Sequence, residues 1–300
     1  MSLTNESYVI AQRLLEESNY VVEAALDSYF NSDPLETVVP TTVSPAESSE
    51  GPVDLDGLEI TVMSWNIDGL DARSIRTRMM AVYKIVKMHN PDFLFLQEVV
   101  EREIEHIQKL EKFYKIYYAN RGALYFTAIL VSRAFEVENH EVIHYRNSGM
   151  MRTLQIVKGF IGEQVVFLLN THLESMAEHS DKRKEQFAQC MEKVKDIIKA
   201  NPNSLLFFGG DLNIRDHEIS NVPRGLADAW VAAGADRKTE FTWDTRLNDN
   251  KSAHGARKRF DRIFWYGPLK KVQFSLQGQS RIRSCLCFPS DHWAVLCNFS

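Results

Sequence analysis

The sequence has no long hydrophobic run, although 44% of its 300 residues are hydrophobic. A membrane-spanning helix needs roughly 18 or more consecutive apolar residues, and no stretch of this chain comes near that length. The N-terminus has no basic segment followed by an apolar one, so we expect neither a membrane partner nor a secretory signal peptide. The length and composition predict one large domain, alone or with a small second one.

Cysteine is scarce, with four copies: Cys190, Cys285, Cys287 and Cys297. They do not have the spacing of a zinc finger. We expect all four to be reduced thiols, as in an intracellular protein, and a disulfide is the less favoured alternative.

Proline is rare outside one stretch, residues 32–56, which contains four of the nine prolines together with Ser, Thr and Glu. This composition predicts a flexible linker. Before it, apolar residues at helical spacing over residues 5–31 predict two short helices, which cannot bury much core. Residues 1–31 are therefore predicted to be a small helical segment, and residues 57–300 the main domain.

Basic side chains are almost missing from the first 56 residues, where eleven acidic residues stand against Arg13. This leaves a net charge of −10 there and +5 on residues 57–300. Residues 246–283 hold ten Lys or Arg against two Asp. Such a basic zone fits a polyanionic ligand, although an ordinary solvated basic face explains the charge equally well.

Strands and helices alternate in the main domain. Strands are predicted at 58–65, 93–96, 114–118, 123–132, 154–157, 164–170, 204–208, 259–266, 272–276 and 293–299. Helices are predicted at 72–89, 101–112, 178–200 and 226–233. Mixed strands with few helices over this length favour two packed sheets flanked by helices.

Polar side chains collect where the apolar strands end. Asp211 and Asn213 follow the strand at 204–208, and in an extended chain residues two apart point to the same side. Asn66 and Asp68 follow the first strand with the same spacing. Each pair alone is typical of a turn or cap.

Further strand ends carry Gln97-Glu98, Asn170-Thr171-His172 and Ser290-Asp291-His292. So many acids and amides at buried strand ends are costly unless they share a partner, and a cation is the natural one. Oxygen ligands without cysteine favour Mg²⁺ or Mn²⁺ over zinc.

Asp261 lies inside a strand pattern and should be paired there. Its partner is either His292, which would fix the histidine tautomer and raise its pKa, or one of the neighbours Arg259 and Arg262. The sequence alone leaves both alternatives open.

These motifs resemble, in order, those of the endonuclease/exonuclease/phosphatase superfamily: Ser-Trp-Asn at 64–66, Leu-Gln-Glu at 96–98, Asn-Thr-His at 170–172, Gly-Asp-Leu-Asn at 210–213 and Ser-Asp-His at 290–292. The resemblance covers residues 58–300. It implies an α/β protein of the DNase I-like type, a four-layer α/β/β/α sandwich of two packed mixed sheets.

Within that superfamily the chain is similar to the 5′-tyrosyl-DNA phosphodiesterases, through segments 65–71, 125–129, 150–152, 172–175, 241–245, 260–264 and 290–293. The resemblance implies hydrolysis of the bond between a topoisomerase II tyrosine and a DNA 5′ end, leaving a 5′-phosphate for double-strand break repair. It also implies a nuclear protein with some cytoplasmic pool. Residues 1–31 resemble a UBA-like module, which implies ubiquitin as their partner.

The resemblance assigns catalytic roles to Asn66, His172, Asp211, Asn213, Asp261 and His292. Asp211 would position and deprotonate the attacking water with help from Asn213. His172 and His292 would donate to phosphate oxygens, with His292 oriented by Asp261, and Asn66 would lie near metal and phosphate.

The resemblance also implies a magnesium ion, replaceable by Mn²⁺, on Glu98, with Asp68 and Asp291 completing its surroundings. The residues implied along the DNA strand are Tyr125, Arg152, Ser175 and Trp243. Both aromatic residues also fit a strand core, and the basic run at 257–259 could hold backbone phosphates.

Three other functions stay open on the sequence. A phosphatase or diesterase for inositol phosphates or lipids would not need Trp243 for stacking. An abasic-site endonuclease would cut intact duplex at the lesion. A non-catalytic scaffold would tolerate loss of Glu98.

Overall fold

The computed structural model describes residues 57–253 and 255–300. The predicted helical segment at 1–31 and linker at 32–56 lie outside these residues. Within the described part of the chain, no helix is long and apolar enough to cross a membrane.

The first of two large sheets has six strands, in the order β13 (Val272–Gln277), β14 (Ala294–Phe299), β1 (Ile60–Asn66), β2 (Phe93–Val99), β4 (Phe126–Ser132) and β3 (Tyr114–Ala119). β1 and β2 are parallel and the other pairs are antiparallel. Asn66 ends β1 and Glu98 lies near the end of β2, so the parallel pairing of these strands brings both residues to the same end of the sheet.

The second large sheet also has six strands, in the order β5 (Glu136–His144), β6 (Thr153–Ile161), β7 (Gln164–His172), β8 (Leu205–Asp211), β12 (Asp261–Tyr266) and β9 (Ala227–Asp228). β7 and β8 form its parallel pair. A two-stranded ribbon of β10 (Trp243–Asp244) and β11 (Arg257–Lys258) completes the described strands.

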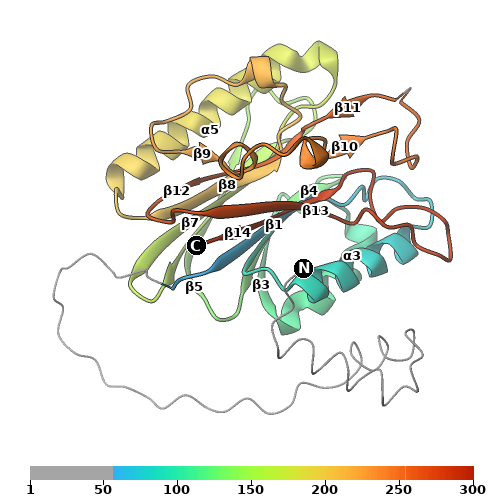
Figure 1. The fold of residues 1–300 in the computed structure, drawn as a ribbon, viewed down its shortest axis with the longest axis horizontal. Helices are drawn as coiled ribbons and strands as arrows, with labels where there is room; N and C mark the ends of the chain where they lie inside the picture. The colour runs from blue at the N-terminus through green and yellow to red at the C-terminus, as the bar shows by residue number, and fades with distance from the viewer. Residues whose placement is uncertain (1–56, 254) are drawn as a thin grey trace. The chain divides into compact units, whose positions relative to one another are not determined.

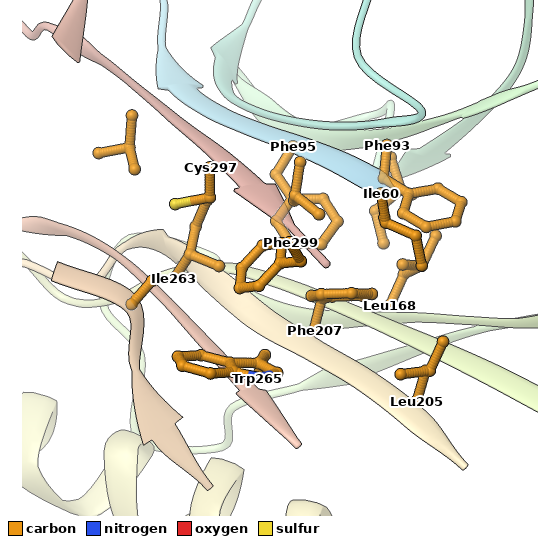
Figure 2. Packing of buried hydrophobic residues seen from close by; sticks show 14 of the residues in the cluster. Ile60, Phe93, Phe95, Leu168, Leu205, Phe207, Ile263, Trp265, Cys297 and Phe299 are labelled. Carbon is orange, nitrogen blue, oxygen red and sulfur yellow. The ribbon is translucent and has the colours of Figure 1, made fainter. Parts of the chain in front are cut away.

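The two sheets pack face to face over an apolar core. In β8, Leu205 and Phe207 face this core, while Leu206 and Phe208 belong to the cluster on the other face of the sheet. Because side chains alternate along a strand, the apolar run of β8 fills both layers. Figure 2 shows Phe207 between the two sheets, close to Phe299.

Helices cover the outer faces. α3 (Ile75–His89) and the short α4 (Ile104–Gln108) pack on the first sheet, and α5 (Ser180–Ala200) packs on the second (Figure 1). The short helix α6 (Ala229–Ala232) follows β9, and 3₁₀ turns lie at Glu101–Glu103, Lys109–Lys112, Ala177–His179, Asp216–Glu218 and Arg237–Thr239. The predicted four-layer α/β/β/α sandwich is confirmed.

Some elements differ from the prediction. β5, β10 and β11 were not expected, and the helix predicted at 101–112 is divided into α4 and a 3₁₀ turn on each side. The helix predicted at 226–233 contains the two-residue strand β9 followed by α6.

The cysteines also differ. Cys285 and Cys287 form a disulfide, so the expectation of four reduced thiols is wrong for this pair. Leu286 between them has a φ of 55°, and this turn folds the chain back so that the two sulfurs meet. Cys190 and Cys297 are free and buried.

Candidate active site

Three strands of the second sheet bring a histidine and two carboxylates together. β7 and β8 run parallel, and their register places His172 beside Asp211. β12 runs antiparallel to β8 and begins with Asp261, the register partner of Asp211. These three buried side chains therefore form a row across one end of the sheet.

The first sheet contributes an amide and a third carboxylate. Asn66 ends β1, and Glu98 lies near the end of β2, where the pairing with β4 shifts register. Glu98 has a φ of 56°, which belongs to this bulge. Bulges re-aim side chains at functional sites, and the Glu98 carboxylate here accepts a hydrogen bond from Asn66 (3.1 Å).

Asn66 connects the two sheets. Its Nδ2 donates to Glu98 Oε1 and also to Asp211 Oδ2, at 2.9 Å. Because this buried amide group donates to both acids, it fixes the separation between the carboxylates of Glu98 and Asp211.

Asn213 does not project beside Asp211 as the spacing predicted. Its φ of 50° takes it out of the extended conformation, and its backbone N–H donates to Asp211 Oδ1 (3.0 Å). Its side chain instead donates to the carbonyl of Leu173 (3.3 Å). Asp68 likewise has a φ of 50° and donates from its backbone N–H to Asn66 Oδ1. Both pairs are Asx turns, so the ordinary turn interpretation holds beside the functional one.

Gly210 directly precedes Asp211, at a point where the backbones of β7 and β8 approach each other closely. A Cβ atom there would lie 1.9 Å from the carbonyl oxygen of Thr171, and its φ is 128°. A larger residue would separate β7 from β8 and misplace Asp211 relative to His172.

His292 reaches the site from the turn before β14. Its Nδ1 lies 2.8 Å from Asp261 Oδ2, whereas Arg259 and Arg262 pair with Asp216 and Asp228. The structure thus decides between the alternatives for Asp261 in favour of the histidine. Thr242 adds a hydroxyl that donates to Asp261 Oδ2 (2.5 Å) and accepts the Asp261 backbone N–H (3.0 Å).

The two histidines differ in charge. Burial alone would lower the pKa of His292, but the carboxylates of Asp261, Asp211 and Asp291 raise it well above 6.5. Burial and the Arg152 guanidinium lower the pKa of His172 to about 4, against the opposing effect of Asp211. At neutral pH, His292 is therefore an imidazolium and His172 a neutral imidazole.

Arg152 also fixes the tautomer of His172. Its Nη1 donates to His172 Nδ1, so the ring hydrogen of the neutral histidine is on Nε2. That nitrogen lies 3.3 Å from Asp211 Oδ2, and His292 Nε2 lies 3.8 Å from the same oxygen. Burial raises the pKa of Asp211. The two histidines and the hydrogen bond from Asn66 lower it by a larger amount, so the pKa lies below the usual range of an aspartate.

The comparison with known families agrees with this geometry. The model of the family described as "Endonuclease/Exonuclease/phosphatase family" matches residues 63–292, which include all the strand-end motifs above. The chain belongs to this family.

Individual relatives within the endonuclease/exonuclease/phosphatase family narrow the comparison. The chain is 56% identical to a 5′-tyrosyl-DNA phosphodiesterase of Caenorhabditis briggsae, over 99% of this chain and 87% of that one. It is 30% identical to tyrosyl-DNA phosphodiesterase 2 of Homo sapiens, over 96% of this chain and 87% of that one.

Solved structures of tyrosyl-DNA phosphodiesterases also resemble this chain. Truncated TDP2 of Caenorhabditis elegans matches with a TM-score of 0.81 and 64% identity, over 82% of this chain and 99% of that one. D. rerio TDP2 in complex with a single-strand DNA product matches with a TM-score of 0.75 and 30% identity, over 81% of this chain and 99% of that one.

The residues present fit the divalent cation expected in the endonuclease/exonuclease/phosphatase family. Burial, Asp291 and Asp68 together raise the pKa of Glu98 to about 7, so three carboxylates repel one another here. Asp68 Oδ2 is buried and accepts no hydrogen bond, and Arg78 Nη1 lies 3.5 Å from it. A cluster of hard oxygen donors of this kind is the donor set that Mg²⁺ and Mn²⁺ prefer.

A second group, Asp211, Asp261 and His292, has ligand atoms within 4.8 Å of one another. These atoms are already engaged, because Asp261 Oδ2 binds His292 Nδ1 and Asp211 Oδ2 accepts from Asn66. A cation there would have to break both contacts.

The four residues expected along DNA flank the histidines of this family site on two sides. On the His172 side, Tyr125 stacks under the Arg152 guanidinium at 4.9 Å, and Ser175 donates to Met150 Sδ (3.2 Å). On the His292 side, Trp243 forms a β-bridge with His292, and its indole N–H donates to Asp291 Oδ2 (3.2 Å). Tyr125 and Trp243 are half-buried, so neither is a core residue.

The basic run at 257–259 is less available for phosphates than its charge suggests. Arg257 pairs with Asp244 (2.8 Å), and Arg259 pairs with Asp228 and Asp216. Two of the three positive charges in this run are therefore compensated locally.

Sequence reasoning missed two residues at the site. Thr242 supports Asp261, and its position directly before Trp243 in a quoted motif was the available signal. Lys251 binds Asp68 across a sequence distance that no motif or spacing indicated.

Proposed function

We propose that this protein is a metal-dependent 5′-tyrosyl-DNA phosphodiesterase, which hydrolyses the phosphotyrosyl bond at a DNA 5′ end. The family membership and the 56% identity to a named 5′-tyrosyl-DNA phosphodiesterase support the reaction. The intact set of strand-end residues argues against a non-catalytic scaffold.

One observation carries the proposal: three N–H donors converge on Asp211 Oδ2. Asn66 Nδ2, His172 Nε2 and His292 Nε2 lie at 2.9, 3.3 and 3.8 Å from it. Such a buried, preorganised donor set also suits the oxygens of a phosphodiester whose charge grows in the transition state. Removal of one such donor typically costs about 10²–10³ in rate.

Asp211 is the residue that activates water. Its pKa lies below the usual range, so it is ionised at neutral pH, and the backbone N–H of Asn213 holds one of its oxygens. A water hydrogen-bonded to this carboxylate would give up its proton as its oxygen attacks phosphorus in line with the bond to tyrosine.

His172 and His292 act as donors of different charge. The imidazolium of His292, held by Asp261, stabilises negative charge on the phosphoryl oxygens, and the neutral His172 donates one hydrogen bond from Nε2. The tyrosine phenol has a pKa near 10, so its phenolate leaves much more readily than an alkoxide, and the phosphate stays on the DNA 5′ end.

Glu98 would hold the divalent cation, with Asp68 and Asp291 completing its surroundings. When bound, the cation supplies positive charge to the phosphoryl oxygens and the leaving phenolate. We propose Mg²⁺ as the ion, with Mn²⁺ as a substitute.

Single-stranded or frayed DNA fits the aromatic pair best. Tyr125 and Trp243 offer ring faces on both sides of the histidines, and stacking of a base on an aromatic ring contributes about 1–3 kcal/mol. Arg152 would serve as a phosphate contact, and Ser175 as a neighbouring polar one.

The biological setting is also part of the proposal. The substrate would be the adduct of topoisomerase II on DNA, met mainly in the nucleus during double-strand break repair. Residues 1–31 would bind ubiquitin through the UBA-like segment, and residues 57–300 would be the catalytic domain.

The test is an oligonucleotide with a 5′-phosphotyrosyl end, incubated with the protein and Mg²⁺ or with EDTA. We expect release of a 5′-phosphorylated product that requires Mg²⁺, and a loss of about 10³ or more in rate for Asp211→Asn. Circular dichroism of the variant controls for folding.

Two parallel substrates separate the alternatives. Cleavage of intact duplex at an abasic site, or of inositol phosphates, at a higher kcat/KM than the phosphotyrosyl oligonucleotide would overturn the assignment. The fold and family would stand in either case.

A further inference from the structure

Glu174 is a buried carboxylate to which the proposed reaction assigns no role. It lies two residues after His172 and has no exposed surface. Its Oε2 accepts a hydrogen bond from the Ser148 hydroxyl (2.8 Å), and its Oε1 accepts one from the backbone N–H of Gly149 (2.8 Å). A buried charge is costly unless such donors satisfy it, so this carboxylate is bound to the loop between β5 and β6.

Helix α5 holds Glu174 from the other side. Gln186 Nε2 donates to Glu174 Oε2 (3.2 Å), and Gln186 Oε1 accepts from the Glu174 backbone N–H (2.9 Å). Arg183 Nη1 donates to the carbonyl of Glu174 (3.0 Å). Gln186 and Arg183 are themselves buried, so the position of the carboxylate is fixed by the helix.

The Ser148 hydroxyl transmits this constraint to Arg152. While it donates to Glu174, its oxygen accepts the backbone N–H groups of Met150 (3.1 Å) and Arg152 (2.9 Å). A serine hydroxyl has one hydrogen and two lone pairs, so these three contacts use all of its hydrogen-bonding capacity. The acceptor on Glu174 therefore decides which way the hydroxyl points.

The backbone between these two N–H groups is strained. Met151 has a φ of 58°, a left-handed conformation that is uncommon for a residue other than Gly. Such a conformation persists only where the surrounding structure holds it. The side chain of Met151 is exposed, so its own packing does not supply the restraint, whereas the hydrogen bonds to Ser148 lie on either side of it.

Arg152 is the point at which this loop meets the site. Its guanidinium donates to His172 Nδ1 and lies 4.9 Å from the centre of the Tyr125 ring. Its carbonyl accepts from the backbone N–H of Tyr145 (3.2 Å), which closes the loop. A continuous chain of hydrogen bonds thus connects the buried carboxylate of Glu174 to the imidazole of His172.

We propose that Glu174 is a positioning residue, which holds the loop at 148–152 so that the Arg152 guanidinium stays on His172. It acts through Ser148 and Arg152 and does not itself act on the reacting atoms. The effect on rate rests on the proposed function, while the effect on His172 rests on the geometry alone.

The first test is the rate on a phosphotyrosyl oligonucleotide. Glu174→Gln keeps the shape of the side chain but turns one of its acceptors into an N–H₂ donor, which faces the donors Ser148 and Gly149. We expect kcat/KM to fall about 10- to 100-fold, as when a positioning group moves by about an ångström. Ser148→Ala should show a similar loss, and Ser148→Thr, which keeps the hydroxyl, should retain most of the activity.

A double variant shows whether Glu174 acts through Arg152. Once the guanidinium is removed, the loop has nothing left to position. In the Arg152→Ala background, Glu174→Gln should therefore lower kcat/KM by less than about twofold. A purely structural role would instead give losses that multiply in the double variant.

The protonation of His172 reports on Arg152 without any substrate. The ring faces the guanidinium of Arg152, the carboxylate of Asp211, the imidazolium of His292 and the ring of Tyr125. Burial, Arg152 and His292 lower the pKa of His172 to about 4, and Asp211 opposes them. Displacement of the guanidinium should therefore raise the pKa of His172.

The direction of this change is diagnostic. Removal of a negative charge by itself can only lower the pKa of a nearby histidine, so a rise in Glu174→Gln identifies displacement of Arg152. NMR titration of the histidine rings in the presence of Mg²⁺ measures it. His172→Gln assigns the signal, and Arg152→Ala gives the pKa expected when the guanidinium is absent.

Glu185→Gln is the matched control. Glu185 accepts a hydrogen bond from Asn147 in the same loop (2.9 Å) but is exposed, so its variant should keep both the rate and the pKa of His172. Circular dichroism checks that each variant folds. If Glu174→Gln does not fold, Ser148→Ala decides the inference by the same two readouts.

The outcomes are distinct. An unchanged or lowered pKa of His172 in the folded variant, or losses that multiply with Arg152→Ala, would overturn the inference while the hydrolysis of phosphotyrosyl DNA still stood. A wild type that releases no 5′-phosphate would overturn the proposed function, and the pKa of His172 would still decide whether Glu174 positions Arg152.

Discussion

At the scale of residues, the centre consists of side chains whose charges are set by their neighbours. His172 and His292 are both buried, yet one has a lowered and the other a raised pKa. The pKa values differ because the Arg152 guanidinium contacts Nδ1 of His172, whereas the Asp261 carboxylate contacts Nδ1 of His292. A search for histidines near strand ends finds both residues but cannot assign their charges.

Trp243 is the residue that best separates stacking from hydrogen bonding. Trp243→Leu removes the ring and the N–H that donates to Asp291, whereas Trp243→Phe removes only the N–H. We expect Trp243→Leu to raise KM for a phosphotyrosyl oligonucleotide about tenfold, because one base loses its stacking partner. Trp243→Phe should keep KM within about twofold, since a ring face remains for the base.

Steady-state kinetics on the two variants check this prediction. An unchanged KM in Trp243→Leu would contradict a stacking role and favour a substrate without bases, such as an inositol phosphate. A large loss of kcat in both variants would instead indicate that the hydrogen bond to Asp291 is what matters.

At the scale of elements, a buried ion pair joins α5 to the 3₁₀ turn Asp216–Glu218. Arg183 and Glu218 are paired at 2.7 Å with almost no exposure, and Ser180 donates to the same carboxylate. Burial raises the pKa of Glu218, but the hydrogen bonds from Arg183 and Ser180 and from the backbone of Arg215 lower it to about 2. The helix is thus fastened to the loop that follows β8 and Asp211.

The pH dependence of stability follows from that lowered pKa. Its contribution is fully present above the ordinary value of 4.5 and is lost as pH falls toward about 2. We expect Glu218→Gln to lower the free energy of unfolding by roughly 1–3 kcal/mol at pH 7, because a charged hydrogen-bond acceptor is lost. The difference from wild type should shrink between pH 4.5 and pH 2.5, because Glu218 takes up a proton in the unfolded chain over this range while the folded chain keeps it ionised until about pH 2.

Urea unfolding at several pH values measures this. Glu178→Gln, which changes a glutamate at the exposed start of the same region, is the matched control and should follow the wild type. If the free energies of unfolding of Glu218→Gln and wild type differed by the same amount at pH 7 and pH 2.5, the lowered pKa of Glu218 would be contradicted.

The element scale also shows where prediction from sequence works. β8 was found because Leu205 to Phe208 are apolar on both faces, and the motif after it follows from that strand. β5 was missed because it is an edge strand with mostly exposed, polar residues such as Glu136 and Glu141. Apolar periodicity reports burial, so an exposed strand leaves no such signal.

The features of the candidate site also fall into those that the sequence predicts and those that it does not. The sequence motifs identify which residues collect, because each follows a buried strand. They do not give the left-handed backbone of Asn213, which turns its side chain to Leu173, nor the contact of Lys251 with Asp68. Both depend on loop conformations and long-range packing, which local spacing does not encode.

At the scale of the whole molecule, the charge is divided along the chain. Residues 1–56 carry −10 and residues 57–300 carry +5, and the substrate we propose is a polyanion. Removal of residues 1–56 therefore changes the net charge of the protein from −5 to +5. Electrostatic steering depends on such fields and weakens as salt screens them.

We expect the chain without residues 1–56 to have a kcat/KM on a phosphotyrosyl oligonucleotide roughly 3- to 10-fold above that of the full chain at low salt. The gain should vanish near 0.5 M salt, about where the Debye length falls to a few ångströms.

A full-length variant in which the acidic residues of 1–56 are replaced by their amides should behave like the truncated chain. This variant distinguishes the effect of the segment's charge from the effect of its length. A mononucleotide tyrosyl ester, with little charge to steer, should show no gain. Equal rates for the full and truncated chains at every salt concentration would mean that the acidic segment does not act on the catalytic domain through its charge.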